Sequence, residues 1–186
     1  MGKTQLRDRI IQTAAELFYQ NGYNSTGINE IIAKSGIAKA TLYSHFKSKE
    51  DLCLSYLQHM NVKFLDSIKE FCFSKPASMQ RVLSIFDYLE EFFDDRQFNG
   101  CWCIKTVAEI PKDNTKIRAE IQNQKGQFIE LLKELTQVNY KGKSTAYKDS
   151  KVKQIYLLYE SAVGESHLHQ KNWPIQEAKT ICAQII

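Results

Sequence analysis

Apolar residues recur at helical spacing along almost the whole chain of 186 residues. The first such stripe consists of Leu6, Ile10, Ala14, Leu17 and Phe18. Proline, which interrupts helices, occurs only at positions 76, 111 and 174, and the strict alternation typical of strands is scarce. Such a chain buries its apolar surface by packing helices against one another, so we expect an all-α fold.

Capping and breaking residues divide the chain into about nine helices. The expected ranges are about 4–21, 27–35, 39–45, 49–72, a fifth helix from Pro76 to the Asn99-Gly100 break, 102–110, a seventh helix capped by Asp113 or Asn114, 147–169 and 175–186. We expect Thr26 to cap the second helix and Ser48, with Asp51 three residues later, to cap the fourth. We place one domain at residues 1–47 and a second at 48–186.

Composition narrows the functional class only slightly. The chain is 43% hydrophobic and 25% charged, with a net charge of +4. No apolar run approaches the roughly 20 residues that span a bilayer, and no apolar stretch follows the basic start, so we expect a cytoplasmic protein without a secretory signal. Five cysteines, an odd number, favour reduced thiols over a disulfide framework.

Positive charge gathers near the beginning of the chain. Residues 1–50 hold seven basic and four acidic side chains, a net charge of +3. Clustering of this kind is a weak indication of a nucleic-acid site, and a solvated surface explains it nearly as well.

Residues 28–46 carry the most informative motif. Two short helices flank a tight turn that contains Gly36, which is the layout of a helix-turn-helix whose second helix enters the major groove of DNA. Leu42 and Phe46 are the expected apolar anchors of that helix. Lys39, Ala40 and Thr41 are placed to meet base edges, and Tyr43 and His45 can donate to phosphates. The full predicted DNA-binding set is Thr26, Lys34, Lys39, Ala40, Thr41, Tyr43, Ser44, His45 and Lys49.

Residues 10–54 resemble the DNA-binding domain of the TetR family of transcriptional regulators. The matching strings are Ile11-x-x-Ala14-Ala15-x-Leu17-Phe18, Asn21-Gly22-Tyr23, Thr26 with Ile31-Ile32-Ala33, Ser35-Gly36-Ile37, and Lys39-Ala40-Thr41-Leu42-Tyr43-x-His45-Phe46-x-Ser48-Lys49-Glu50-x-Leu52. The resemblance implies that the third helix reads the major groove. Ala38 departs from the Ser that members often carry, so we expect weaker capping there without loss of binding.

The same resemblance implies a repressor that is released from a pseudo-palindromic operator by a small-molecule effector. It also implies a homodimer in which the last two helices form an intersubunit four-helix bundle. Candidate packing residues are Ile155, Tyr159, Ala162, Val163, Ile181 and Ile185, although for any single one of them the subunit core is the favoured location. The candidate effector pocket is lined by Phe64, Tyr88, Phe93, Trp102, Phe128 and Tyr159, and rings at helical spacing are more often core residues.

Phe98-Asn99-Gly100-Cys101-Trp102-Cys103 is the most unusual string outside the DNA-binding segment. A Gly-Cys pair at this point occurs in a branch of the family in which some members sense electrophiles or oxidants. Cys101 and Cys103 are therefore candidate thiol sensors, and a cysteine-based regulator is the alternative function. A free cysteine is also commonly a small buried apolar residue.

A small all-α enzyme or ligand carrier is the competing class. The sequence has no Gly-rich phosphate loop, no His-Glu-x-x-His string and no nucleophile–base motif, so we expect no enzyme and no cofactor. His167 and His169, two residues apart, point to different sides of a helix, so we also expect no metal site.

Overall fold

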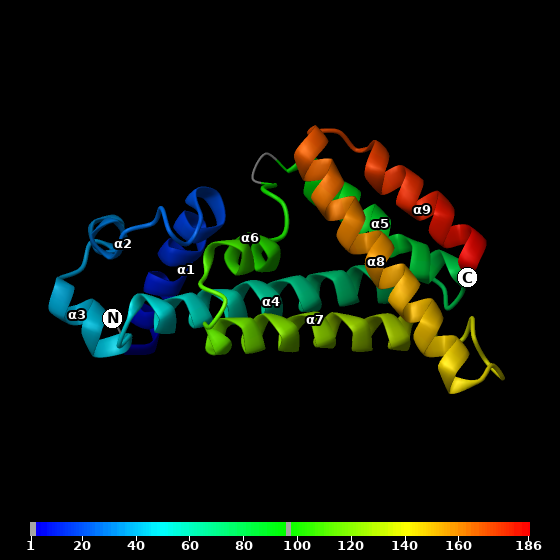
Figure 1. Cartoon of the computed structure of the whole chain (residues 1–186), viewed down its shortest axis with the longest axis horizontal. Coiled ribbons are helices and arrows are strands. Elements are labelled where there is room, and N and C mark those ends of the chain that lie inside the picture. Colours follow the sequence, from blue (N-terminus) through cyan, green and yellow to red (C-terminus); the bar gives the residue numbers. More distant parts are fainter. Residues whose placement is uncertain (1–2, 96–97) are drawn as a thin grey trace. The chain divides into compact units, whose positions relative to one another are not determined.

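A computed structural model of the chain describes residues 3–95 and 98–186 (Figure 1). Within these ranges the chain forms nine α-helices and no strand, as the apolar periodicity predicts. The helices are α1 (Lys3–Asn21), α2 (Ile28–Ser35), α3 (Lys39–His45), α4 (Lys49–Phe73), α5 (Met79–Asp94), α6 (Trp102–Glu109), α7 (Thr115–Thr136), α8 (Thr145–His169) and α9 (Trp173–Ile185).

Most helix boundaries lie within about two residues of the prediction, and both exceptions concern α5. Pro76 lies before α5, which begins at Met79 because the Ser78 hydroxyl accepts a hydrogen bond from the N–H of Gln80 at 3.2 Å. Helix α5 ends at Asp94, ahead of the predicted break, and residues 96 and 97 lie outside the described part. Pro174 occupies the first turn of α9, where its missing N–H costs no helical hydrogen bond.

The helices separate into two compact units. One unit comprises Met1–Lys63 and Trp102–Gln124, and the other comprises Phe64–Cys101 and Lys125–Ile186. Because α4 and α7 each contribute to both units, these packing units do not coincide with the domains expected at residues 1–47 and 48–186, and that division remains a prediction.

The first unit is organised around α1, which packs against α2. Ile10, Ala14 and Phe18 of α1 are buried, and the Phe18 ring lies 5.4 Å from that of Tyr56 in α4. Ile31 of α2 is fully buried as well. The helical period predicted the apolar face of α1. That period therefore also determines the side of α1 against which the helix-turn-helix packs.

The second unit contains α5, α8 and α9, of which α8 and α9 lie side by side (Figure 1). Its core includes Val82, Ile85 and Leu89 of α5 together with Val152 of α8 and Ile175 of α9. Among residues 3–95 and 98–186, no helix combines the length and the apolar character needed to cross a lipid bilayer.

Four of the residues proposed for intersubunit packing belong instead to this core. Ile155, Tyr159, Ala162 and Val163 are all buried within the second unit. Their spacing places them on the face of α8 that meets its own subunit, so the opposite face is the one left open.

That opposite face of α8 carries exposed apolar side chains. Leu157 is 64% exposed and Leu168 is 71% exposed, and their separation of eleven residues places them on one side of the helix. Of the six predicted packing residues, Ile181 of α9 is the one that is exposed, at 44%. Ile185 is half-buried.

Candidate nucleic-acid interface

A left-handed glycine joins α2 to α3. Gly36 has φ 63° and ψ 39°, and its N–H donates to the carbonyl of Ala33 at 3.1 Å. The N–H of Ile37 donates to the carbonyl of Ile32, which closes the end of α2. The chain then turns sharply into α3, as the glycine-containing motif predicted.

Helix α3 is held to the first unit by its apolar side. Leu42 is fully buried and Phe46 is 1% exposed, which confirms both as anchors. The guanidinium of Arg7 lies 5.1 Å from the centre of the Phe46 ring and donates to the Ser55 hydroxyl at 3.1 Å. These contacts hold α3 rigidly by one face.

The other face of α3 is polar and open. Lys39, Ala40, Tyr43 and Ser44 are exposed, with Tyr43 at 45%, whereas Thr41 and His45 are half-buried. The Ser44 hydroxyl donates to the carbonyl of Thr41 at 2.8 Å. Ala38 stands at the N-cap and makes no side-chain cap, as its methyl group predicted, and its carbonyl accepts from the N–H of Thr41 at 3.0 Å.

Thr26 differs from its predicted role. Gly27, not Thr26, occupies the N-cap of α2, and the Thr26 side chain is fully buried. Its hydroxyl donates to the carbonyls of Gly22 at 2.8 Å and Leu17 at 3.2 Å. Thr26 therefore fastens the α1–α2 turn from within, and its side chain does not face solvent. Threonine often bonds to nearby backbone in this way, and the sequence alone does not distinguish the two uses.

The two outlying lysines of the predicted set have different surroundings. Lys34 is exposed and pairs with Glu16 at 3.1 Å. Lys49 is half-buried: its ammonium lies 4.5 Å from the centre of the Tyr23 ring and 3.5 Å from the carbonyl oxygen of Asn24. Burial lowers the pKa of the Lys49 ammonium.

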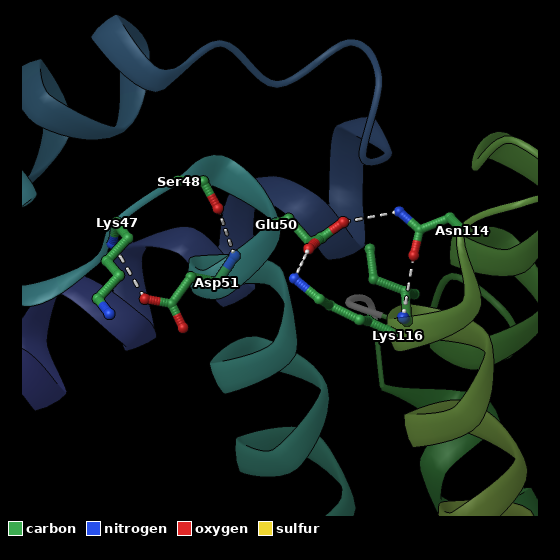
Figure 2. A network of polar contacts seen from close by, with 7 residues as sticks. Lys47, Ser48, Glu50, Asp51, Asn114 and Lys116 are labelled. Atoms are coloured by element: carbon green, nitrogen blue, oxygen red, sulfur yellow. Dashed lines mark hydrogen bonds and ion pairs between the residues drawn. The ribbon is translucent and has the colours of Figure 1, made fainter.

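The start of α4 is capped as predicted (Figure 2). The N–H of Asp51 donates to the Ser48 hydroxyl at 3.1 Å, and the Asp51 carboxylate accepts from the N–H of Lys47 at 3.0 Å. This pair of bonds differs from a capping box, in which the Asp51 carboxylate would accept from the N–H of Ser48 itself. The two bonds fix the chain directly after α3.

Glu50 makes contacts that sequence reasoning missed. Its carboxylate accepts from the side-chain amide of Asn114 at 2.9 Å and from the Lys116 ammonium at 3.2 Å (Figure 2). Asn114 also caps α7, because its side-chain oxygen accepts from the N–H of Ile117 at 3.1 Å. The sequence predicted the Asn114 cap. It gave no indication that Asn114 also bonds to Glu50, which lies 64 positions away.

Glu109, at the end of α6, was also missed. Its carboxylate accepts from the backbone N–H of Asn24 at 2.6 Å, and the Asn24 side-chain amide donates to the Glu109 carbonyl at 2.8 Å. Nearby, the Lys105 ammonium donates to the carbonyl of Tyr19 at 2.7 Å. These bonds tie the α1–α2 turn to α6 inside the first unit.

Four of the six rings proposed for the effector pocket form one aromatic cluster. The Phe64 ring lies 6.2 Å from that of Tyr88 and 5.3 Å from that of Phe128, which lies 4.9 Å from Tyr159. Tyr159 is 4% exposed, and burial raises the pKa of its hydroxyl well above the ordinary value.

The two remaining rings lie apart from this cluster or in the other unit. Phe93 packs against Phe98, with ring centres 5.3 Å apart. Trp102 belongs to the first unit, where its indole N–H donates to the Gln124 side chain at 3.4 Å. The lining of an effector pocket therefore remains a proposal.

The two candidate sensor cysteines have opposite environments. Cys101 is half-buried, and its sulfur accepts a hydrogen bond from the Lys125 ammonium at 3.2 Å. Lys125 also binds both carboxylate oxygens of Glu160, at 2.6 and 2.8 Å. Cys103 is buried, and its thiol donates to the Gln124 side-chain oxygen at 3.4 Å. In the described part of the chain, no group of His, Cys, Asp and Glu side chains is arranged to hold a metal ion.

Comparison with known proteins agrees with this architecture. Residues 10–56 match the family model of the bacterial regulatory proteins of the tetR family. The transcriptional regulator QacR of Staphylococcus aureus is 43% identical over 65 residues, 35% of each chain. The fatty acid metabolism regulator protein of Bacillus subtilis is 25% identical over 124 residues, 67% of this chain. The Bacillus subtilis regulator YerO is 36% identical over 95 residues, half of this chain. The chain spans 33%, 62% and 35% of the lengths of YerO, the fatty acid regulator and QacR.

Solved structures extend the likeness over the whole fold. A TetR-family regulator from Streptomyces coelicolor has a TM-score of 0.87 at 23% identity, covering 98% of this chain and 94% of its own. The reduced form of NemR from E. coli has a TM-score of 0.82 at 20% identity, covering 97% of each chain. The tetR family model thus matches the helix-turn-helix segment in sequence, and TetR-family structures match the nine described helices in fold.

Proposed function

We propose that the chain is a cytoplasmic repressor that binds a pseudo-palindromic DNA operator as a homodimer and is released by a small-molecule effector. The observation that carries this proposal is the division of α3 into a buried anchor, Leu42 and Phe46, and an open face that includes Lys39 and Tyr43. A short helix held rigidly on one side and polar on the other is what entry into a major groove requires.

The open residues of α3 suit different parts of the duplex. Lys39 and Ala40 lie at the N-terminal end of the helix, the part that approaches base edges, where Lys donates to guanine and a methyl contacts thymine. Tyr43, Ser44 and His45 follow as donors to phosphates. Lys34 and Lys49 add charge at the two sides, and Thr41 is the remaining residue proposed to contact DNA.

The outer face of α8 and α9 supports the proposed homodimer. Leu157 and Leu168 of α8 and Ile181 of α9 present apolar surface that a single subunit leaves open. Gly164, which lies between the two leucines on the same side of α8, is exposed and has no neighbouring atom near its α-carbon, so a second helix can approach closely. A symmetric pairing of this face with itself would bury all three apolar side chains.

The aromatic cluster of the second unit supports an apolar effector. Phe64, Tyr88, Phe128 and Tyr159 come from α4, α5, α7 and α8, so a molecule placed among them would touch all four helices. Phe93, in the same unit, is proposed as a further lining residue.

Selection from a random duplex library tests the proposal directly. The wild-type chain should enrich a pseudo-palindrome with half-sites about one helical turn, or a multiple of it, apart. Fluorescence anisotropy should then show affinity that falls steeply with salt as phosphate counterions are released. Failure to bind any enriched sequence more tightly than random duplex would refute the proposal.

A cysteine-based regulator on the same scaffold is the second candidate, and the Lys125–Cys101 contact favours it. An ammonium 3.2 Å from the sulfur stabilises the thiolate, the form that reacts. With a conjugated carbonyl compound, the sulfur would bond to the β-carbon and a proton would be taken up at the α-carbon. Treatment with such an electrophile should release DNA from wild type and from Cys103→Ser, but not from Cys101→Ser.

A further inference from the structure

We propose that Glu50 and Glu109 are positioning residues for DNA binding, which together hold Lys49 and the α1–α2 turn in the geometry that the duplex requires. The inference rests on the proposed DNA-binding function. It concerns two carboxylates that the DNA phosphates would repel, since both carry the same charge as DNA.

Glu109 acts through Asn24. The carboxylate of Glu109 accepts from the backbone N–H of Asn24 at 2.6 Å. The backbone carbonyl of Glu109 accepts from the Asn24 side-chain amide at 2.8 Å, so Asn24 is held through both its backbone and its side chain. The carbonyl of Asn24 is then the atom that lies 3.5 Å from the Lys49 ammonium. Lys49 is thereby oriented through one intermediate residue.

Glu50 follows Lys49 directly in the first turn of α4. Its carboxylate is bonded to Asn114 and Lys116 at the start of α7, so the backbone that carries Lys49 is fixed by the adjacent residue (Figure 2). Lys116 is 73% exposed and contributes little to this anchoring, whereas the Asn114 amide is part-buried and is itself fixed as the cap of α7. Asn114 is therefore the main partner of Glu50.

The arrangement gives the two carboxylates an effect opposite to their charge. Removing a negative charge near a DNA-binding surface ordinarily tightens binding, because repulsion from phosphates decreases. If Glu50 and Glu109 position Lys49, their removal weakens binding instead. The sign of the change in affinity thus separates positioning from electrostatics.

The experiment measures binding of full-length variants to the duplex selected with wild type. We expect Glu50→Ala and Glu109→Ala each to weaken affinity about tenfold, the loss that one charge-assisted hydrogen bond allows. The slope of log Kd against log salt should fall by about 0.9, the value of one phosphate contact. Glu109→Gln keeps an oxygen acceptor for Asn24 and should restore most of the affinity.

Matched variants distinguish positioning from loss of fold. Glu134→Ala removes a carboxylate that pairs with Lys69 at 2.9 Å in the second unit, so it should leave both affinity and slope unchanged. Asn114→Ser keeps a capping oxygen for α7 but loses the amide that donates to Glu50, and it should reproduce the Glu50→Ala effect. In a Lys49→Ala background, Glu109→Ala should change the slope no further.

If the wild-type chain binds the selected duplex, and Glu50→Ala and Glu109→Ala bind it as tightly or more tightly, this inference is overturned. The proposed function would then still stand. A change in affinity with the salt slope of wild type would also overturn the inference, because partial unfolding lowers the active fraction without removing a phosphate contact. A wild-type chain with no preferred duplex would refute the proposed function, and the inference with it.

Discussion

The carboxylate of Glu109 occupies the space that a side chain at Gly22 would need. A Cβ built on Gly22 would overlap a carboxylate oxygen of Glu109, and the backbone of Gly22 has φ +92°, a conformation that side-chain-bearing residues rarely adopt. The positive φ therefore favours glycine where the α1–α2 turn meets α6, and a side chain there would also displace the Glu109 carboxylate.

Gly22→Ala should destabilise the fold more than Gly36→Ala does. Both substitutions place a side chain at positive φ, at a cost of about 1 kcal/mol, but Gly36 has no atom near its Cβ position, whereas Gly22 has Glu109. Urea denaturation of both variants measures the difference. Adding Glu109→Ala to Gly22→Ala should cost less than the sum of the single changes, and strict additivity would contradict the steric explanation.

Two substitutions in α3 should have different effects on DNA binding. Tyr43→Ala should weaken binding by about 1 kcal/mol for every sequence, because a phosphate donor carries no base information. Lys39→Ala should change which bases are preferred, since it removes a donor to guanine. Duplex selection with each variant, followed by anisotropy, checks both. The same selected motif for wild type and Lys39→Ala would show that Lys39 does not contact bases.

Cys101 should be the only cysteine that a maleimide labels in the folded protein at pH 7.5. It is half-buried, whereas the other four cysteines are buried. Intact-mass spectrometry should show one adduct in wild type and none in Cys101→Ser. Lys125→Gln should slow labelling, because the Cys101 thiolate loses the ammonium that stabilises it. Glu160→Gln should accelerate it, and equal rates in all variants would rule out a role for Lys125.

Stability should fall as the pH rises above about 9. Burial raises the pKa of the Cys53 and Cys182 thiols from 9.0 to about 12, so between these values the unfolded chain releases protons that the folded chain retains. Each thiol should lower the free energy of unfolding by about 1.4 kcal/mol per pH unit in that window, and its contribution is fully present below pH 9. Burial likewise raises the pKa of Tyr140 from 10.0 to about 12, which adds to the loss above pH 10.

Urea denaturation at pH 8, 9 and 10 measures this dependence. Cys53→Ala/Cys182→Ala should be less stable at pH 8 because it leaves cavities, but its stability should decline less steeply with pH. A decline identical to that of wild type would mean that the two thiols do not titrate as their burial indicates.

Leu168→Arg and Leu157→Arg should convert the proposed dimer to a monomer. Each places a charge on the open face of α8, where a symmetric interface would bury it twice without a partner. Val138→Arg is the matched control, because Val138 is 57% exposed but lies outside α8 and α9. Light scattering at micromolar concentration distinguishes the masses. A wild-type monomer, or dimeric arginine variants, would place the interface elsewhere.

Local signals predicted the elements of this fold well. The apolar period, Gly36 in its left-handed turn, the Ser48 cap and the Asn114 cap all involve residues within a few positions of one another, so neighbouring residues suffice to predict them. Thr26 shows where local reasoning fails, since a hydroxyl before a helix can bond forward to cap it or backward to the preceding turn. Packing against α1 decided for the second use.

The sequence by itself determined that α3 follows a glycine turn with Leu42 inward and Tyr43 outward, because helical period and glycine geometry depend only on neighbouring residues. Only the tertiary structure decided that Glu50 meets Asn114, that Glu109 meets Asn24, and that Cys101 rather than Cys103 lies beside Lys125. These partners are 24 to 85 positions apart, and a charged side chain carries no local preference for a distant partner until the core has brought the two together.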